Sequence, residues 1–145
     1  MKLVLLFLFL LSGFLNADAK IFSTDTVTVN GTKFLFVKCL SENEDSGNMD
    51  TVWKVYRIEN GVRHYLLKQE IFAMDGDCNS IFKNYGSYEV KGDSIIFNTE
   101  FSVERDKNFG LPYREKQVYL VKDDGKLILI YDAEEYDDGW HRKNQ

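Results

Sequence analysis

SIIFNTEFSVE, residues 94–104, is the stretch of sequence that decides the fold class. Its odd-numbered positions from 95 to 103 hold apolar residues or threonine, and its even-numbered positions are polar with the exception of Ile96. A period of two with one polar face is typical of a strand in an antiparallel sheet that covers a core. The residues predicted to face that core are Ile95, Phe97, Thr99, Phe101 and Val103.

Four short turn signals divide the rest of the chain. Asn-Gly suits the positive φ angles of a type I′ hairpin turn, and glycine serves the other turns in a similar way. Four turns predict four hairpins and eight strands. The turns are Asn30-Gly31, Asn60-Gly61, Lys91-Gly92-Asp93 and Asp123-Asp124-Gly125, and the other strands are expected at about 21–29, 32–40, 51–59, 62–72, 86–91, 114–122 and 126–132.

The predicted fold is all-β, an eight-stranded antiparallel meander. It can close into an up-and-down, lipocalin-like barrel or form a sandwich of two packed sheets, and the pattern alone does not separate the two. We favour the barrel because closure removes unpaired strand edges. Three longer connections, 41–50, 73–85 and 105–113, follow every second strand, so we expect them at one end of the molecule as a binding rim.

The first 19 residues have the pattern of a secretory signal peptide. Lys2 precedes an apolar run from Leu3 to Leu11, and Ala17-Asp18-Ala19 matches a cleavage site. The run is shorter than the ~20 residues of a membrane-spanning helix, so the sequence predicts an exported protein, periplasmic or extracellular, without a membrane anchor. Residues 20–145 are predicted to form one β domain, for whose tail, 133–145, the pattern allows irregular structure.

Two cysteines, Cys39 and Cys78, predict one disulfide in an exported chain. Closing the loop between them would contribute about 3–4 kcal/mol by a chain-entropy argument. A reactive thiol or a metal pair is the less favoured alternative, because the sequence has neither a Cys-x-x-Cys motif nor a histidine near either cysteine.

The spacing of Asp75, Asp77 and Asn79 matches the beginning of a calcium loop. The continuation does not match, since Ser80 stands where the loop needs glycine and Gly86 where it needs a bidentate glutamate. Short polar side chains also bond to their own backbone in ordinary turns. We therefore predict a turn that is tied down by the disulfide and holds no metal.

Three segments together resemble META-type domains, which are small exported bacterial β proteins. They are Trp53-Lys54-Val55, Asp77-Cys78-Asn79 and GSYEVKGDSI (86–95), and they follow the order Trp, Gly-Cys-Asn and Gly-x-Tyr-x-x-x-Gly-x-x-Leu/Ile of that family. The resemblance covers about half of the predicted mature chain. It implies a small exported β protein and no known activity.

Catalysis has little support in the sequence. The two histidines, His64 and His141, lie in a predicted strand and in the tail. No triad, phosphate loop, zinc spacing or dinucleotide fingerprint accompanies them, so neither an enzyme nor a cofactor is predicted. The net charge of -5 also argues against nucleic acid as a partner.

Two binding functions remain open. The first is a protein-interaction or inhibitor module that presents its acidic loops to a cationic protein such as a lysozyme. The alternative is a lipocalin-like carrier of a small apolar ligand inside the barrel. For either function the candidate rim residues are Glu42, Glu44, Asp45, Asp75, Asp77, Asn79, Phe82, Tyr85, Phe109 and Tyr113.

Overall fold

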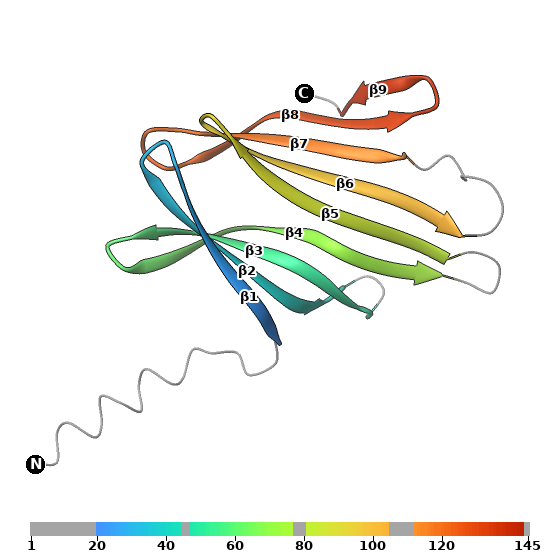
Figure 1. The fold of residues 1–145 in the computed structure, drawn as a ribbon, viewed down its shortest axis with the longest axis horizontal. Coiled ribbons are helices and arrows are strands. Elements are labelled where there is room, and N and C mark those ends of the chain that lie inside the picture. The colour runs from blue at the N-terminus through green and yellow to red at the C-terminus, as the bar shows by residue number, and fades with distance from the viewer. Residues whose placement is uncertain (1–19, 45–46, 77–80, 105–111, 144–145) are drawn as a thin grey trace, which may run out of the picture.

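The computed structural model describes residues 20–44, 47–76, 81–104 and 112–143 (Figure 1). These residues form nine strands in one sheet, paired antiparallel in chain order, and contain no helix, hence none that could cross a membrane. The predicted all-β antiparallel meander is confirmed. The strands are β1 (Ile21–Val29), β2 (Thr32–Glu42), β3 (Met49–Glu59), β4 (Val62–Gly76), β5 (Ile81–Lys91), β6 (Ser94–Glu104), β7 (Arg114–Val121), β8 (Leu127–Tyr136) and β9 (Gly139–Arg142).

The four predicted hairpin turns are confirmed. In Asn30-Gly31 the φ angles are 47° and 74°, and in Asn60-Gly61 they are 50° and 77°. Two successive positive φ angles are what a type I′ turn requires. Gly92 and Gly125 also have positive φ and join β5 to β6 and β7 to β8.

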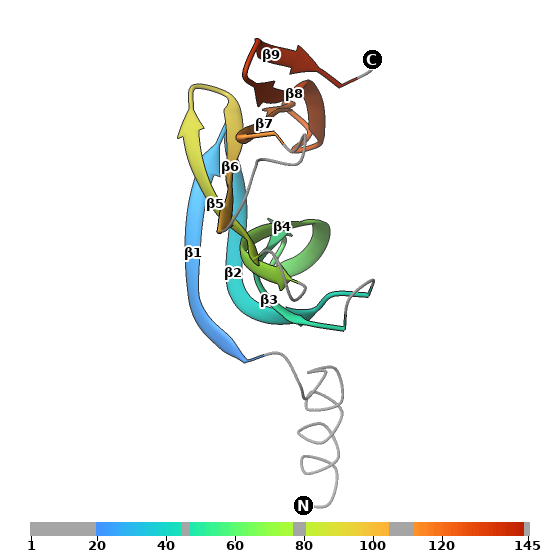
Figure 2. The ribbon, with the colours of Figure 1, turned by 90° about the vertical axis from the view of Figure 1, so that its right-hand side faces the viewer.

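The sheet is open, so the barrel closure that the sequence favoured is not found among the described residues. There β1 pairs only with β2, and β8 pairs with β7 and β9. The reason lies between β4 and β5, which pair only over Phe72–Gly76 and Ile81–Tyr85. Beyond this pairing the two strands diverge (Figure 1), and the sheet is strongly bent when seen from its end (Figure 2). Away from this pairing, the halves β1–β4 and β5–β9 contact each other through side chains.

The main core lies between these two halves. The ring of Phe36 in β2 stacks on Tyr88 in β5 with 4.1 Å between ring centroids. The ring centroids of Trp53 and Phe97 lie 6.2 Å and 6.3 Å from the ring centroid of Phe36. The predicted inner face of β6 is confirmed in part, because Ile95, Phe97 and Thr99 are buried. The fully enclosed residues of this core are Val29, Phe34, Phe36, Val55, Ile95, Phe97 and Val121.

A second, smaller cluster covers the other face of β2. Leu35, Val37 and Cys39 pack there with Val52 of β3. Cys39 is buried, and among the described residues it is a free cysteine and no disulfide is seen. Cys78 lies outside the described residues, so the disulfide stays a prediction.

The prediction of a long loop at 73–85 is wrong over most of this range. Ala73–Gly76 pairs with Ile81–Asn84, so this part is strand rather than loop. Acidic and glycine residues such as Asp75 and Gly76 suggested a loop, but the register of the long hairpin overrides their local preference. Asp77 and Asn79 of the predicted metal-free turn lie outside the described residues.

The tail is also more regular than its pattern suggested. β8 continues to Tyr136, and β9 pairs back onto its last four residues, Ala133–Tyr136. The backbone N–H of Lys143 donates to Asp132 O, and its Nζ lies 2.5 Å from Glu115 Oε1 and 2.8 Å from Glu134 Oε1. The predicted signal peptide, residues 1–19, lies outside the described residues. Both it and export stay predictions.

Tyr88 supplies a pH-dependent contact between the two halves. Its hydroxyl donates to a carboxylate oxygen of Asp25 in β1. Burial raises the pKa of Tyr88, and the bond to Asp25 and the charge of that carboxylate raise this pKa further. A phenol whose pKa is raised in the folded state stabilises the fold below its ordinary pKa of about 10, and this contribution is lost at higher pH.

We therefore expect the free energy of unfolding of the native protein to fall as the pH rises above about 10. In a Tyr88→Phe variant this decline should be less steep, because one of the groups responsible is gone. At neutral pH the variant should lose about 1 kcal/mol, the usual contribution of one hydrogen bond. Urea denaturation at a series of pH values measures both effects, and equal slopes for the two proteins would contradict the assignment.

Candidate functional site: a cleft between two hairpins

An open cleft of about 590 Å³ lies between the end of the β3–β4 hairpin and the β7–β8 hairpin. Leu66 and Leu67 of β4 form one wall, and Tyr119 of β7 and Leu127 of β8 form the other. All four side chains also pack against the main core. The apolar wall of the cleft is therefore continuous with the core, and it opens where the two halves of the sheet diverge.

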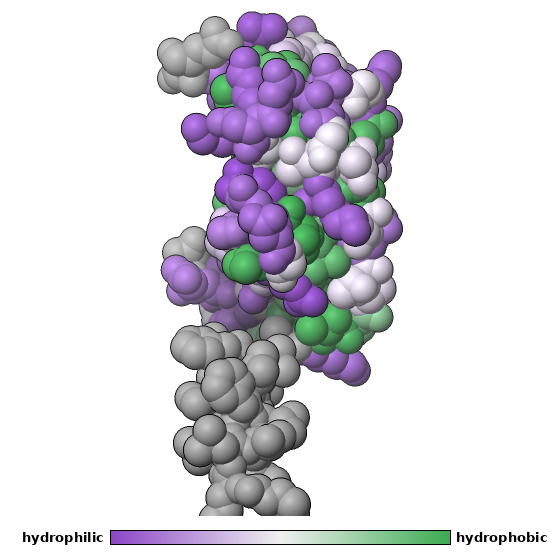
Figure 3. Space-filling model, turned by 90° about the vertical axis from the view of Figure 1, so that its left-hand side faces the viewer, coloured by the Kyte–Doolittle hydropathy of each residue, from purple (hydrophilic) through white to green (hydrophobic). Residues whose placement is uncertain are grey.

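The rest of the lining is polar and basic. Arg57 of β3, His64 of β4 and Lys126 beside β8 contribute nitrogen-bearing side chains. Of the described residues that line the cleft, none is acidic. Tyr65, which is 57% exposed, completes the lining. The face of the molecule that carries these hairpin ends is mostly hydrophilic with smaller apolar areas between (Figure 3).

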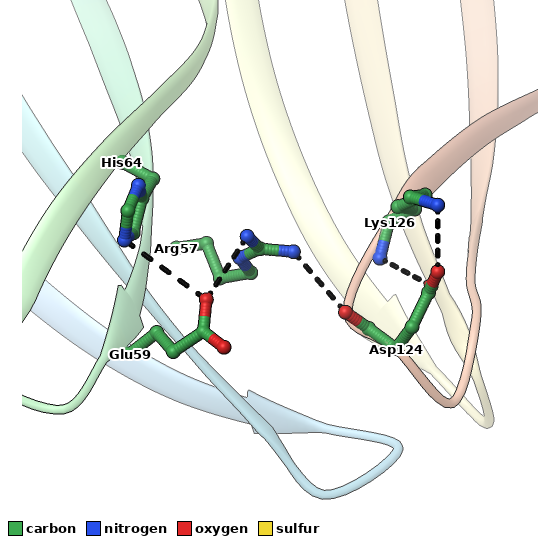
Figure 4. A network of polar contacts seen from close by, with 5 residues as sticks. All are labelled: Arg57, Glu59, His64, Asp124 and Lys126. Carbon is green, nitrogen blue, oxygen red and sulfur yellow. Dashed lines mark hydrogen bonds and ion pairs between the residues drawn. The ribbon is translucent and has the colours of Figure 1, made fainter.

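Arg57 connects the two sides of the cleft (Figure 4). Its Nη1 donates to the backbone oxygen of Asp124 in the β7–β8 turn at 3.1 Å. Its Nη2 donates to Glu59 Oε2, also at 3.1 Å, and the same oxygen lies 3.9 Å from Nε2 of His64. One guanidinium thus contacts both the β3–β4 hairpin and the turn opposite.

Lys126, on the β7–β8 side of the cleft, is held by Asp124 of the adjacent turn. Its Nζ lies 2.9 Å from Asp124 Oδ2, and its backbone N–H donates to Asp124 Oδ1 at 3.1 Å (Figure 4). These two bonds lower the pKa of the Asp124 carboxyl. The Lys126 side chain is nevertheless 73% exposed, so its ammonium group can reach a ligand at the mouth of the cleft.

Close packing fixes the position of the β7–β8 turn. A Cβ atom on Gly125 would lie 2.9 Å from Arg57 Cδ and 2.9 Å from Thr32 Cγ2, so glycine is required for this approach. Asn30 in the β1–β2 turn donates from Nδ2 to Val121 O and to Asp123 Oδ1, both at 3.0 Å. The wall formed by β8 is therefore attached to the first half of the sheet.

Asn30 offers a direct test of this attachment. Asn30→Gly keeps the positive φ of the turn but removes both side-chain bonds, so we expect a loss of about 1 kcal/mol in the free energy of unfolding. Asn60→Gly is the matched control, because Asn60 occupies the same position in the other type I′ turn. Chemical denaturation of both variants provides the comparison. Equal losses would show that the Asn30 bonds contribute nothing.

The predicted rim lies at the opposite end of the sheet. The ends of β2, β4 and β6 and the starts of β3, β5 and β7 gather there, as expected from the antiparallel register. Glu42 and Glu44 are exposed at this end. The structure does not bring any of these residues to the cleft.

The other rim candidates divide into three groups. Tyr85 and Tyr113 are 47% and 40% exposed, and the Tyr113 hydroxyl donates to Asp137. Asp75 and Phe82 stand opposite each other in β4 and β5, which makes them strand residues, and their side chains are not described. Asp45, Asp77, Asn79 and Phe109 lie outside the described residues.

The basic residues of the cleft were missed by the sequence analysis. Arg57 precedes the Asn60-Gly61 turn by three positions, His64 follows it by three, and Lys126 directly follows the turn that ends at Gly125. In an antiparallel meander these tight turns lie at one end of the sheet. Basic residues that flank turns of the same end were therefore the available signal.

No protein-family model, curated protein or solved structure matches the chain. The resemblance to META-type domains stays a prediction. The histidines form no shared site within the described residues, since His64 lies beside Glu59 and His141 Nε2 lies 2.7 Å from Asp138 in the turn before β9.

Proposed function

We propose that the protein binds a small ligand with a largely apolar body in the cleft between the β3–β4 and β7–β8 hairpins. The cleft itself is the supporting observation, because about 590 Å³ is a typical volume for a small-molecule site. Its wall packs against the core, so a ligand would remove apolar surface of both molecules from water. The function is that of a binding or carrier protein rather than an enzyme.

A neutral fluorescent probe tests this proposal. 1-Aminoanthracene is apolar, and its emission changes when it leaves water. We expect saturable binding by the native protein and about five- to tenfold weaker binding by Tyr65→Ala, since the variant loses one aromatic wall of the cleft.

Tyr85→Ala is the matched control for this titration. Both tyrosines are exposed strand residues beside one other aromatic ring, with centroids 5.7 Å apart for Tyr56 and Tyr65 and 5.5 Å apart for Phe72 and Tyr85. Only Tyr65 lines the cleft. Absence of probe binding, or equal weakening by both substitutions, would contradict the proposed site.

A protein-interaction module is the second candidate, favoured by the described part of the acidic connection after β2. Asn43 Nδ2 donates to the buried Asp50 at 2.9 Å, and the backbone N–H of Asn43 donates to Asn48 O at 2.7 Å. These bonds support the exposed Glu42 and Glu44 as a preformed acidic surface. Inhibition of a cationic lysozyme by the native protein, and its loss in the double variant Glu42→Lys, Glu44→Lys, would support this function.

A further inference from the structure

We propose that the ligand of the cleft is an amphipathic carboxylate, whose anionic head group contacts Arg57 and Lys126 while its apolar tail lies along Leu66, Leu67 and Leu127. This inference rests on the proposed function, since it assigns a chemical class to the ligand of the same site. Three features of the site support it: the charge of the lining, the unused Nη donors of Arg57 and the position of the acidic groups.

Arg57 does not use all of its N–H donors within the described part of the chain. A guanidinium carries five N–H donors, and within the described part of the chain Arg57 uses one for Asp124 O and one for Glu59 Oε2. Its Nε is buried and has no hydrogen-bond partner among the described residues, so the donors left for a ligand are the second N–H groups of Nη1 and Nη2. A carboxylate that takes two parallel N–H bonds is the ligand group for which this side chain is best shaped.

A ligand carboxylate can replace an acidic partner in this network. Glu59 and Asp124 are 56% and 53% exposed, and neither lines the cleft. Exposed ion pairs contribute little stability, so the guanidinium can exchange Glu59 for a ligand carboxylate at small cost. His64 adds a further nitrogen-bearing side chain to the lining of the cleft.

The distribution of polarity orients the ligand. Arg57 and Lys126 lie beside Asp124 of the β7–β8 turn (Figure 4), and the Lys126 side chain is 73% exposed, whereas Leu66, Leu67, Tyr119 and Leu127 pack against the core. A head group at the mouth keeps its remaining oxygen lone pairs in contact with water. A linear or aromatic apolar tail then covers the leucine side chains, so neither a purely apolar ligand nor a fully polar anion fits both parts of the site.

Displacement of 1-aminoanthracene by decanoate and by decan-1-ol separates the head group from the tail. The two molecules have the same chain length and differ in charge. We expect decanoate to displace the probe from the native protein at about tenfold lower concentration than decan-1-ol. Arg57→Gln and Lys126→Gln should each reduce this preference several-fold and leave the affinity for decan-1-ol nearly unchanged.

Lys122→Gln is the charge-matched control, because Lys122 is exposed in the same turn but does not line the cleft. It should retain the full preference for decanoate. If Arg57→Gln perturbs the turn that it contacts, the exposed Lys126→Gln still provides the test. Circular dichroism of each variant confirms that the fold is kept.

Three outcomes are distinguishable. Preference for decanoate that depends on Arg57 and Lys126 supports the carboxylate assignment. Equal displacement by both compounds would overturn it while the proposed function stands. Failure of both compounds to displace the probe, together with equal binding by Tyr65→Ala and the native protein, would overturn the proposed function and the inference with it.

Discussion

Replacing Gly86 with alanine should lower the free energy of unfolding by about 3 kcal/mol or more. A Cβ atom at Gly86 would lie 1.8 Å from the backbone oxygen of Glu70, 2.8 Å from its carbonyl carbon and 3.1 Å from Ile71 Cα. These are backbone atoms, so no side-chain rotation can relieve the contact. The only relief is separation of β4 from β5 at the point where their pairing ends.

Gly92→Ala provides the control for this substitution. Gly92 has φ 59° and no atom within 4 Å of its would-be Cβ, so alanine there costs only backbone strain of about 1 kcal/mol. Urea denaturation of both variants gives the comparison. A Gly86→Ala variant that is no less stable than Gly92→Ala would show that β4 and β5 do not approach as described.

The second large effect is expected for Phe36→Ala, at about 3–5 kcal/mol. Phe36 is fully buried and contacts the rings of Trp53 in its own half of the sheet and of Tyr88 and Phe97 in the other. The substitution leaves a cavity between the halves because the surrounding rings are fixed by their strands. Near-ultraviolet circular dichroism should change as well, since the stacked rings lose their common partner.

Phe22→Ala is the matched control for the loss of a ring. Phe22 lies in β1 and is 47% exposed, so its removal should cost less than about 1 kcal/mol. Chemical denaturation measures both variants. Similar losses for Phe22→Ala and Phe36→Ala would contradict a core shared by the two halves of the sheet.

The strands and most turns could be predicted because their signals are local. Asn30-Gly31 and Asn60-Gly61 adopt the positive φ angles that their residues favour. The same reasoning was available for the tail, where Asp137-Asp138-Gly139 repeats the Asp-Asp-Gly of the β7–β8 turn and joins β8 to β9. The ninth strand could therefore have been predicted from the sequence.

The form of the sheet could not be predicted because it depends on contacts between distant residues. β2 is buried on both faces from Phe34 to Val37, so its sequence lacks the alternation that marks an inner and an outer side. The pairing of β4 with β5 ends where Gly86 approaches Glu70. The glycine is visible in the sequence, but the register and the residue that it approaches are not.

The cleft is a product of that divergence. The long connections were predicted to form a binding rim, since loops commonly carry function. The structure instead has its cleft at the tight turns, where Arg57 meets Asp124 across 67 positions of sequence. Basic residues beside a hairpin turn are ordinary surface residues until the opposite turn is known.

Binding of decanoate in the cleft is the central claim, and a ¹H–¹⁵N NMR titration of the protein with decanoate tests it most directly. We predict that the largest amide shift changes fall on Arg57, His64, Leu67 and Leu127, with small changes at the other end of the sheet. Shift changes concentrated at Glu42, Glu44, Tyr85 and Tyr113, or none at saturating decanoate, would contradict the claim.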